Sequence, residues 1–307
     1  MKLLKFLISK MLDYSNFQII YRNGSAIGDQ LCLTAVVEHI RESSKKRIIL
    51  FTSKPEIFYN NESFYKIFSI KNDLKSKIIL KILKLLNCKN IIEYRSKKKA
   101  QNNQYFLKQL NKKEHLAVAH INDEKLKKNI SNDLFCKIKF SSEEINRYEK
   151  KFILPKKFAV VQSETKTTFT ENKNWNTESF QYIIDNIKEV EWYQIGYKEK
   201  KLNNTIDYTE NTNLREFAYI ISKANFVVCL ESLYNHVASA FQKKVFMIVS
   251  GFIPVEHVIY RNTIPIQYDQ YLECKPCYLL TKCPIPNKPC TNKINPSDVV
   301  EIIKKNL

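Results

Sequence analysis

Residues 17–42, FQIIYRNGSAIGDQLCLTAVVEHIRE, place a strand, a glycine turn and a helix in succession, and this order decides the fold. The apolar run Phe17–Arg22 predicts a strand, and Ile27–Glu42 predicts a helix. Gly24 and Gly28 lie in the turn between them. Glycine permits tight turns and close approach of the backbone to a ligand. Because ligands of open α/β sheets bind beyond the carboxyl ends of strands, this turn predicts part of a binding site.

The two other glycines of the chain also follow predicted strands. Gly196 closes the strand Glu191–Ile195, and Gly251 follows the apolar segment Val245–Ser250. The chain has only four glycines, and all of them follow predicted strands. This placement indicates that ligands bind at the carboxyl edges of the sheets. Ordinary strand-ending turns are the alternative.

Strands and helices alternate along the whole sequence, which predicts an α/β fold with parallel sheets covered on both faces. In the first half we expect strands at Phe17–Arg22, Arg47–Thr52, Asn90–Glu93, Leu116–Ile121 and Phe135–Phe140, with helices at Ile27–Glu42 and Leu74–Leu86. In the second half we expect strands at Phe158–Gln162, Glu191–Ile195, Phe226–Leu230 and Val245–Val249, with helices at Thr177–Ile187, Leu214–Ala224, Asn235–Phe241 and Pro296–Lys305.

The length of 307 residues suits two domains better than one. The segment KKFILPKK at 150–157 puts charge and a proline between a helix and a new strand. We therefore expect two Rossmann-like domains, residues 1–153 and 154–307, that face each other across a cleft.

The charge of the chain is concentrated in its first half. Residues 1–150 hold 30 Lys and Arg against 15 Asp and Glu, whereas residues 151–307 hold 20 against 16. A coding bias toward lysine accounts for part of the total but not for this asymmetry. The first half is therefore expected to face an anionic partner: nucleic acid, an acidic membrane surface, or a phosphorylated or carboxylated substrate.

The sequence has no run of the ~20 apolar residues that a membrane span needs. The start, MKLLKFLISKML, is interrupted by lysine and lacks a small-residue cleavage site, so we expect a cytoplasmic protein. Two basic amphipathic stretches, 3–11 and 74–86, suit binding at the inner membrane surface. For the second stretch, a helix that covers a sheet is the simpler interpretation.

Three polar segments at predicted strand ends are candidates for the site. Asp29 begins the first helix, where a carboxylate acts either as a helix cap or as a general base for an incoming hydroxyl. In the loop 163–175, Lys173 is a cation for phosphate and Thr165 a hydroxyl donor. At 225–249, Glu231 ends a strand and His236 lies in the first turn of the next helix, where backbone N–H groups suit a diphosphate.

Four cysteines lie close together in CKPCYLLTKCPIPNKPC, at Cys274, Cys277, Cys283 and Cys290. In a cytoplasmic chain such a group favours thiolate coordination of zinc or iron over disulfides. Reduced packing thiols or a redox pair are the alternatives.

Three of these segments together resemble glycosyltransferase family 9, the ADP-heptose:lipopolysaccharide heptosyltransferases. IGDQLCLTAVVEHI resembles the family's N-terminal GD-x-L motif, KNW resembles its K-x-W loop, and LESLYNHVASAFQ resembles its D-[ST]-G-x-x-H segment. The run of four cysteines before a final helix also occurs in this family, and iron is known at four cysteines in its autotransporter-modifying branch, with a different spacing.

The resemblance implies a GT-B fold and an inverting transfer of a sugar, most simply heptose from ADP-heptose, with no cofactor required for catalysis. The acceptor would be an anionic glycan such as the lipopolysaccharide core. Asp29 would be the catalytic base, with Gly24 and Gly28 in the acceptor-side loop. The donor would contact Thr165, Lys173, Gly196, Glu231, Ser232, Leu233, Tyr234 and His236.

The sequence departs from the family pattern at three positions. Leu233 stands where the family has glycine, Glu231 where it usually has aspartate, and Ala35 where the first motif has proline. A leucine removes room for close backbone approach, which keeps an inactive GT-B relative that serves as a binding subunit as one alternative. A nucleic-acid-binding protein is the other, although no recognition motif for nucleic acid is present.

Overall fold

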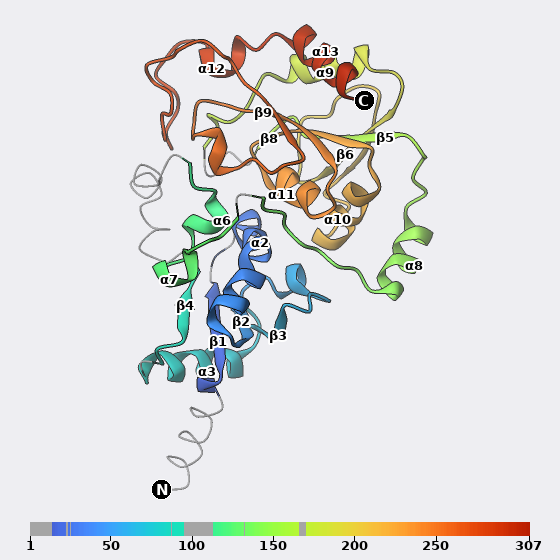
Figure 1. The fold of residues 1–307 in the computed structure, drawn as a ribbon. Coiled ribbons are helices and arrows are strands. Elements are labelled where there is room, and N and C mark those ends of the chain that lie inside the picture. Colours follow the sequence, from blue (N-terminus) through green and yellow to red (C-terminus); the bar gives the residue numbers. More distant parts are fainter. Residues whose placement is uncertain are drawn as a thin grey trace, which may run out of the picture. The chain divides into compact units, whose positions relative to one another are not determined.

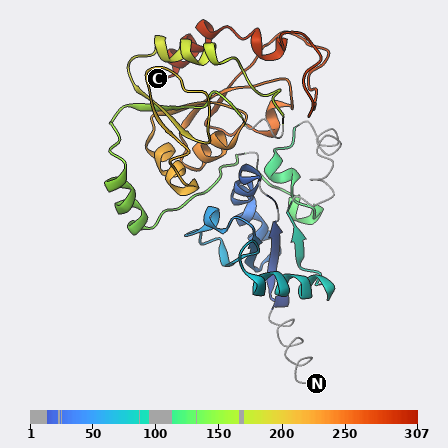
Figure 2. The same ribbon diagram turned by 180° about the vertical axis from the view of Figure 1, so that it is seen from behind.

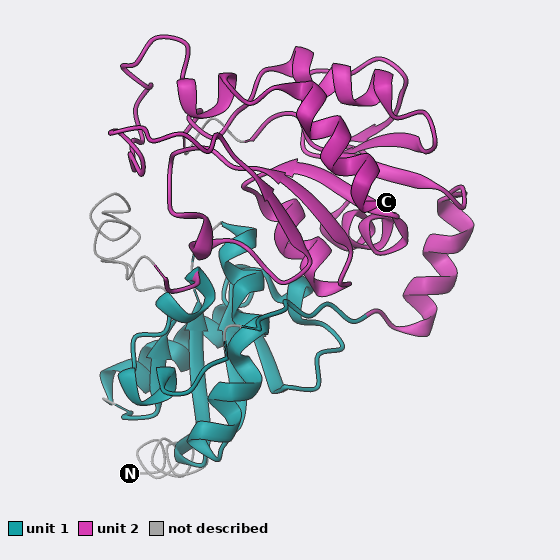
Figure 3. Cartoon of the chain, turned by 45° about the horizontal axis from the view of Figure 1, so that its top comes forward, with its two compact units in different colours: residues 1–103, 116–139 teal, residues 104–115, 140–307 magenta. Residues whose placement is uncertain are grey.

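The computed structural model describes residues 14–22, 24, 26–86, 88–94, 113–131, 133–165 and 170–307. The chain forms two compact units: unit 1 comprises residues 1–103 and 116–139, and unit 2 comprises residues 104–115 and 140–307 (Figure 3). Each unit is an α/β structure built on one sheet whose strand pairs are all parallel. The predicted α/β class with two Rossmann-like sheets is confirmed.

Unit 1 has a four-stranded sheet in the order β3-β2-β1-β4. Its strands are β1 (Phe17–Arg22), β2 (Arg47–Thr52), β3 (Phe64–Ser69) and β4 (Ile91–Glu93). Its helices are α2 (Ile27–Ser44), η1 (Pro55–Phe58), α3 (Leu74–Leu85), α6 (Leu116–Ala119) and α7 (Glu124–Lys127). Asp73 directly precedes α3, and its side chain accepts a hydrogen bond from the Lys75 amide and so caps the helix.

Unit 2 has a six-stranded sheet in the order β10-β9-β8-β5-β6-β7. Its strands are β5 (Phe158–Val161), β6 (Glu191–Gly196), β7 (Thr205–Thr209), β8 (Phe226–Leu230), β9 (Lys244–Ile248) and β10 (Thr263–Ile266). Its helices are α8 (Ser142–Lys151), α9 (Thr177–Asn186), α10 (Leu214–Lys223), α11 (Leu233–Ala240), η2 (Val255–His257), α12 (Pro289–Asn292) and α13 (Pro296–Asn306).

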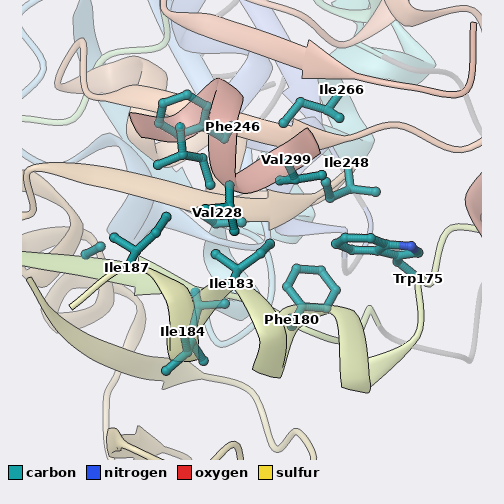
Figure 4. Close-up of a cluster of buried hydrophobic side chains, with 14 of the residues drawn as sticks. Trp175, Phe180, Ile183, Ile184, Ile187, Val228, Phe246, Ile248, Ile266 and Val299 are labelled. Carbon is teal, nitrogen blue, oxygen red and sulfur yellow. The ribbon is translucent and has the colours of Figure 1, made fainter. Parts of the chain in front are cut away.

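Helices cover both faces of the sheet in unit 2 (Figures 1 and 2). The helices α9 and α13 pack against one face, where Phe180, Ile183 and Val299 join a cluster of buried side chains from alternate strand positions (Figure 4). The helices α10 and α11 lie on the other face. Because both faces are covered, the central strands β5 and β8 are buried along their whole length, which is typical of parallel sheets.

Two strands predicted from the sequence are wrong. The segment Leu116–Ile121 contains the short helix α6 instead of a strand, and Phe135–Phe140 contains no strand. Both are short apolar runs, and such runs have too few residues for their period to separate a strand from a buried helix turn.

Three strands were missed by the sequence prediction, and all three lie at the edge of a sheet. They are β3, β7 and β10. An edge strand is exposed on one side, so polar residues interrupt its pattern, as Asp207 does in β7. In β10, Pro265 argues against a strand, yet proline is tolerated at an edge because its missing N–H faces away from the sheet.

Candidate active site

The sheet of unit 2 contains a topological switch point between β5 and β8. The chain runs from β5 outward through β6 to β7, and it then returns to β8 on the other side of β5. Val161 of β5 pairs with Val228 of β8, so the carboxyl ends of these two strands are adjacent (Figure 1). Ligands of open α/β sheets bind at such a point, because the connections diverge there and leave a crevice.

Polar residues follow both strands at this switch point. Gln162 and Ser163 follow β5, and Glu231 and Ser232 follow β8. The Ser232 hydroxyl donates to the Gln162 side-chain oxygen and accepts from the Tyr234 amide at 3.3 Å, which caps α11. Leu233 is the first residue of α11. The sequence-predicted donor segment thus lies at the amino end of a helix, where backbone N–H groups are available to an anion.

Glu231 is a buried carboxylate with a neighbouring cation. Its Oε1 atom accepts hydrogen bonds from the Ser250 amide at 2.8 Å and the Ser250 hydroxyl at 2.9 Å. Its Oε2 atom lies 3.8 Å from Lys173 Nζ and accepts no hydrogen bond from the described residues. Burial raises the pKa of Glu231, and the Lys173 ammonium and the Ser250 donors oppose this rise.

Lys173 lies in the loop after β5, and its ammonium is held between Glu231 and an aromatic ring. The Nζ atom lies 5.0 Å from the ring centroid of Phe252, which is within the range of a cation–π contact. In the same loop, the amide and hydroxyl of Thr165 donate to Asn174 Oδ1 at 2.9 and 2.7 Å. The structure therefore brings Lys173 to Glu231, whereas Thr165 shapes the loop.

The cysteine-rich segment is hydrogen-bonded to the Lys173 loop. The side-chain amide of Asn172 donates to the carbonyl oxygens of Leu279 and Thr281, both at 2.8 Å. Lys288 Nζ donates to the Asn174 carbonyl oxygen at 3.1 Å. The two segments form one hydrogen-bonded unit, so the conformation of the cysteine-rich segment constrains the loop that carries Lys173.

Sequence reasoning missed Glu199, which lies in the loop after β6. Its carboxylate accepts hydrogen bonds from the Ser163 amide at 2.8 Å and the Ser163 hydroxyl at 3.1 Å, and the Tyr234 hydroxyl lies 3.2 Å from its other oxygen. Although the residue as a whole is half-buried, these partners enclose the carboxylate. Burial raises its pKa to about 7, while the Ser163 and Tyr234 donors act in the opposite direction. The sequence could have indicated Glu199, because it lies three residues after Gly196, the glycine that closes a predicted strand.

Gly196 allows the Tyr234 and Phe217 side chains to pack against the end of β6. Its φ is +86°, and a Cβ at this position would lie 3.0 Å from the Phe217 ring and 3.1 Å from the Tyr234 hydroxyl. That hydroxyl also hydrogen-bonds the Ile195 carbonyl oxygen. The absence of a side chain at Gly196 therefore leaves room for the Tyr234 ring. A larger residue would displace this ring.

His236 lies in the first turn of α11 and is tied to Tyr260. Its Nδ1 atom is 2.7 Å from the Tyr260 hydroxyl, and the Tyr260 ring also packs on His115, with the centroids 4.7 Å apart. Asn235 beside it donates to the Val258 carbonyl oxygen at 2.7 Å. These contacts fix the orientation of the imidazole at the amino end of the helix.

The four clustered cysteines are reduced and half-buried. Burial raises the pKa of the Cys277 thiol, and the thiols of Cys290, Cys283 and Cys274 add to this rise. The Cys277 amide donates to the Gly251 carbonyl oxygen at 2.8 Å, which connects the segment to the loop after β9. Within the part of the chain that the structure describes, however, no three His, Cys, Asp or Glu residues are arranged to hold a metal ion.

The sheet of unit 1 has its own switch point, between β1 and β4. The chain runs from β1 through β2 to β3, and β4 lies on the other side of β1. Arg22 ends β1, and Asp29 lies in the first turn of α2. The Arg22 Nη2 atom is 3.5 Å from Asp29 Oδ2, and His120 Nε2 is 3.7 Å from Asp29 Oδ1. The carboxylate predicted as the base is therefore flanked by two basic side chains.

The loop between β1 and α2 is held by side chains. Gln30 Nε2 and the Ser53 hydroxyl both donate to the Gly24 carbonyl oxygen at 2.7 Å. The φ of Gly24 is +135°, a conformation that favours glycine. Gly28 is the second residue of α2, directly before Asp29. Ala26 occupies the N-cap position of α2 without a side-chain hydrogen bond, and Asp29 lies three residues further on, in the first turn.

Sequence reasoning also missed Arg22 and His120. Arg22 is almost fully buried, and this burial lowers the pKa of its guanidinium. The sequence could have indicated Arg22, because an arginine at the end of a buried strand needs a charged or polar partner. His120 was hidden by the wrong strand at Leu116–Ile121, since the helix α6 is what brings it to Asp29.

No helix within the described ranges has the length and apolar character to cross a bilayer. The amphipathic stretch at 3–11 lies outside the described residues, as do Asn23, Ser25, Lys166 and Thr167. The second amphipathic stretch is the helix α3, and one face of it covers the sheet of unit 1, as the simpler interpretation expected.

The model of one protein family, glycosyltransferase family 9 (heptosyltransferase), matches residues 63–250 of this chain. This match covers more than half of the sequence. No curated protein sequence matches the chain significantly.

Several solved structures share the fold at low sequence identity. A family 9 glycosyltransferase from Veillonella parvula aligns with a TM-score of 0.67 at 13% identity, covering 94% of this chain and 97% of the other. The iron-containing dodecameric heptosyltransferase TibC, solved with ADP-D-beta-D-heptose, aligns with a TM-score of 0.67 at 13% identity, covering 94% and 76%. E. coli ADP-heptose lps heptosyltransferase II aligns with a TM-score of 0.65 at 10% identity, covering 94% and 98%.

Proposed function

Since the chain belongs to glycosyltransferase family 9 and is a glycosyltransferase, we propose that it transfers heptose from ADP-heptose to an anionic glycan acceptor. The donor would bind at the switch point of unit 2, and the acceptor at that of unit 1. The observation that carries this assignment is the pair formed by Lys173 and the buried Glu231 beside the amino end of α11.

In unit 2, the polar groups suit the two ends of a nucleotide-diphospho-sugar. Lys173, His236 and the first amides of α11 supply positive charge and N–H donors for the diphosphate as it leaves. The Glu231 Oε2 atom is buried and accepts no hydrogen bond among the described residues, so it is suited to accept one from a sugar hydroxyl. Glu199 lies at the same strand ends and is suited to a second hydroxyl of the nucleotide or sugar.

In unit 1, Asp29 would act as the general base. The acceptor hydroxyl oxygen forms a bond to C1 of the sugar, its proton passes to the Asp29 carboxylate, and the bond from C1 to the diphosphate oxygen breaks with inversion. Arg22 Nη2 and His120 Nε2 lie 3.5 and 3.7 Å from the Asp29 carboxylate oxygens, so both side chains contribute to its position. No step of this scheme is assigned to a metal.

The acceptor is proposed to be an anionic glycan or glycolipid, such as the inner core of lipopolysaccharide. The support is the charge of residues 1–150, which hold 30 basic against 15 acidic side chains. An acceptor of this kind would bring the enzyme to the inner surface of a membrane. The alternative of a nucleic-acid-binding protein has no support in the family match.

Zinc or iron at Cys274, Cys277, Cys283 and Cys290 stays a prediction of the sequence. The chemistry of four thiols suits these metals, but their arrangement in the structure does not form a binding group. Metal analysis of the purified chain, with Cys277→Ser as the matched variant, tests it. A stoichiometric metal that the variant loses would establish the site.

The test of the donor assignment is calorimetry of the purified chain with ADP, UDP and ADP-heptose. We expect ADP and ADP-heptose to bind and UDP to bind at least tenfold more weakly. Transfer is then measured as ADP release with a heptose-deficient lipopolysaccharide core as acceptor. Tighter binding of UDP would overturn ADP-heptose as the donor. Absence of any nucleotide affinity would instead support an inactive binding subunit.

A further inference from the structure

The helix α3 of unit 1 has a second apolar face, on the side opposite to the sheet. Its inner face is formed by Leu80 and Leu83, which are 6% and 3% exposed and join the buried cluster of unit 1. This inner face accounts for the role of the helix in the fold. The apolar residues on its outer side have no such role.

The outer face carries Leu74, Ile78 and Leu85, whose exposed fractions are 70%, 48% and 71%. Positions 74, 78, 82 and 85 recur at helical spacing, so these side chains form one stripe together with Ile82. Leu86, directly after the helix, is 40% exposed. Among the described residues, no other helix has more than one large apolar side chain that is this exposed. A continuous exposed apolar stripe marks an interaction surface.

Lysines accompany this stripe along its whole length. Between positions 71 and 89 the sequence contains six lysines and one acidic residue, Asp73. Lys77, Lys81 and Lys84 line a groove of about 440 Å³ together with Tyr21, Ile70, Leu80 and Leu85. None of the ion pairs among the described residues involves Lys77 or Lys81. The surface thus pairs apolar side chains with unneutralised positive charge.

We propose that α3 binds the surface of an anionic phospholipid bilayer. The stripe Leu74, Ile78 and Leu85 enters the boundary between head groups and acyl chains, and the lysines contact the lipid phosphates. A helix with an apolar stripe and a lysine-rich polar side is suited to lie in this interface. This inference does not depend on the donor or on the catalytic residues.

Charge complementarity favours a bilayer over the other possible occupants. In a symmetric contact with a second copy, the same lysines would face each other and repel. Residues 1–13 of this chain carry Lys2, Lys5 and Lys10, so they also add positive charge. A soluble polyanion would neutralise the lysines but would leave the apolar stripe in water. An anionic bilayer satisfies both features.

The test is co-sedimentation of the full chain with vesicles, either of phosphatidylcholine alone or of phosphatidylcholine mixed with phosphatidylglycerol. We expect binding to the mixed vesicles that weakens as salt is raised. Because each nearby lysine adds about 1 kcal/mol, the double variant K77E/K81E should bind at least about 25-fold more weakly. The variant I78S/L85S, which keeps all charges, should lose at least about tenfold.

The matched control is K125E/K128E, which changes the net charge of unit 1 equally at two exposed lysines of and beside α7. This control should retain most of the binding, and the circular dichroism of all variants should match that of the parent. Equal loss in the control would mean that only net charge acts, and it would overturn the proposal. Loss restricted to a variant L4D/L7D would assign the membrane contact to residues 1–13 instead.

Light scattering of the same variants tests whether the apolar stripe instead binds a second copy of the chain. If I78S/L85S dissociates a dimer and leaves vesicle binding unchanged, the apolar stripe is a subunit interface and the bilayer proposal fails. If the parent chain binds neither kind of vesicle, the proposal also fails.

Discussion

The two sheets of this chain have the same kind of switch point, but the buried charge beside it is a carboxylate in unit 2 and a guanidinium in unit 1. In unit 2 the Glu231 side chain is 0% exposed and Lys173 lies beside it. In unit 1 the Asp29 side chain is 19% exposed, and the group that is almost fully buried beside it is the cation, Arg22, at 2%. Burial costs an ion its hydration, so each unit stabilises its buried charge with a more exposed counter-charge.

The two carboxylates are therefore suited to different roles. A buried carboxylate that must stay in place suits binding of a ligand hydroxyl, because it is fixed by Ser250 and does not reorganise. A carboxylate that remains partly open to water suits proton transfer, because an acceptor hydroxyl can approach it. Substitutions of the buried pair in unit 2 should therefore reduce stability and donor affinity together, whereas substitution of Asp29 should reduce the rate without changing donor affinity.

The largest expected effect is the loss of transfer in Asp29→Asn. Asparagine keeps the shape of the side chain but cannot take the acceptor proton, so the rate should fall by about 10²- to 10⁴-fold. Donor affinity should stay within about twofold, whereas the free energy of unfolding should fall by up to about 3 kcal/mol, because the buried Arg22 loses this counter-charge. Steady-state kinetics, calorimetry with ADP and urea unfolding measure these three quantities.

Glu124→Gln, on an exposed carboxylate of unit 1, is the control and should behave as the parent does. Transfer at the parental rate by Asp29→Asn would remove this residue from the catalytic step. A loss of donor affinity as large as the loss of rate would break the proposed separation between the units.

The second effect concerns the buried pair. Lys173→Met leaves Glu231 without its cation, and breaking a buried ion pair from one side costs about 3 kcal/mol. The double variant Lys173→Met/Glu231→Gln removes the charge as well, so it should recover most of the lost free energy of unfolding. Neither variant should regain affinity for ADP, because the phosphate cation is absent in both. Urea unfolding and calorimetry provide the two readouts.

Lys198→Met, at an exposed position of the same unit, serves as the control and should change stability by less than about 0.5 kcal/mol. If the double variant is no more stable than Lys173→Met, the destabilisation comes from lost packing and not from the uncompensated charge of Glu231.

A third effect follows from the raised pKa of Glu199. Because burial raises its pKa to about 7, the folded chain keeps a proton that the unfolded chain releases near the ordinary value of 4.5. The stabilisation from the protonated group is therefore complete below pH 4.5 and is lost as the pH rises to about 7. The loss is about 2 to 3 kcal/mol.

Glu199→Gln cannot titrate, so its stability should vary less between pH 4.5 and pH 7 than that of the parent. The measurement is urea unfolding at several pH values across this window. Parallel pH profiles for the two proteins would show that the carboxylate ionises normally and is not enclosed by Ser163 and Tyr234 as the structure shows.

The central strands of both sheets could be predicted from the sequence because their residues are buried on both faces and form uninterrupted apolar runs. The edge strands β3, β7 and β10 could not, since their exposed side removes that pattern. The motif residues Asp29, Lys173, Glu231 and His236 could be located because each follows a central strand.

The partners of these residues depend on tertiary contacts that no local pattern reports. His120 reaches Asp29 only because the segment at 116–119 is a helix, and Glu199 meets Ser163 across 36 positions in the sequence. The outer face of α3 was visible as an apolar pattern, but only the burial of Leu80 and Leu83 shows which leucines remain for another surface.

The smallest expected effect concerns Leu233, where the family pattern has glycine. This residue begins α11, so its amide is among the first N–H groups that would meet the diphosphate. Leu233→Gly removes a side chain from that approach and should tighten ADP binding by about threefold to tenfold. Glycine in the first turn also costs up to about 1 kcal/mol of helix stability, which thermal unfolding without ligand would record. Leu233→Ala separates the two contributions, because alanine frees space without the flexibility of glycine. Weaker binding in both variants would mean that the leucine contacts the donor and that unit 2 recognises it through an apolar surface as well as through its buried charges.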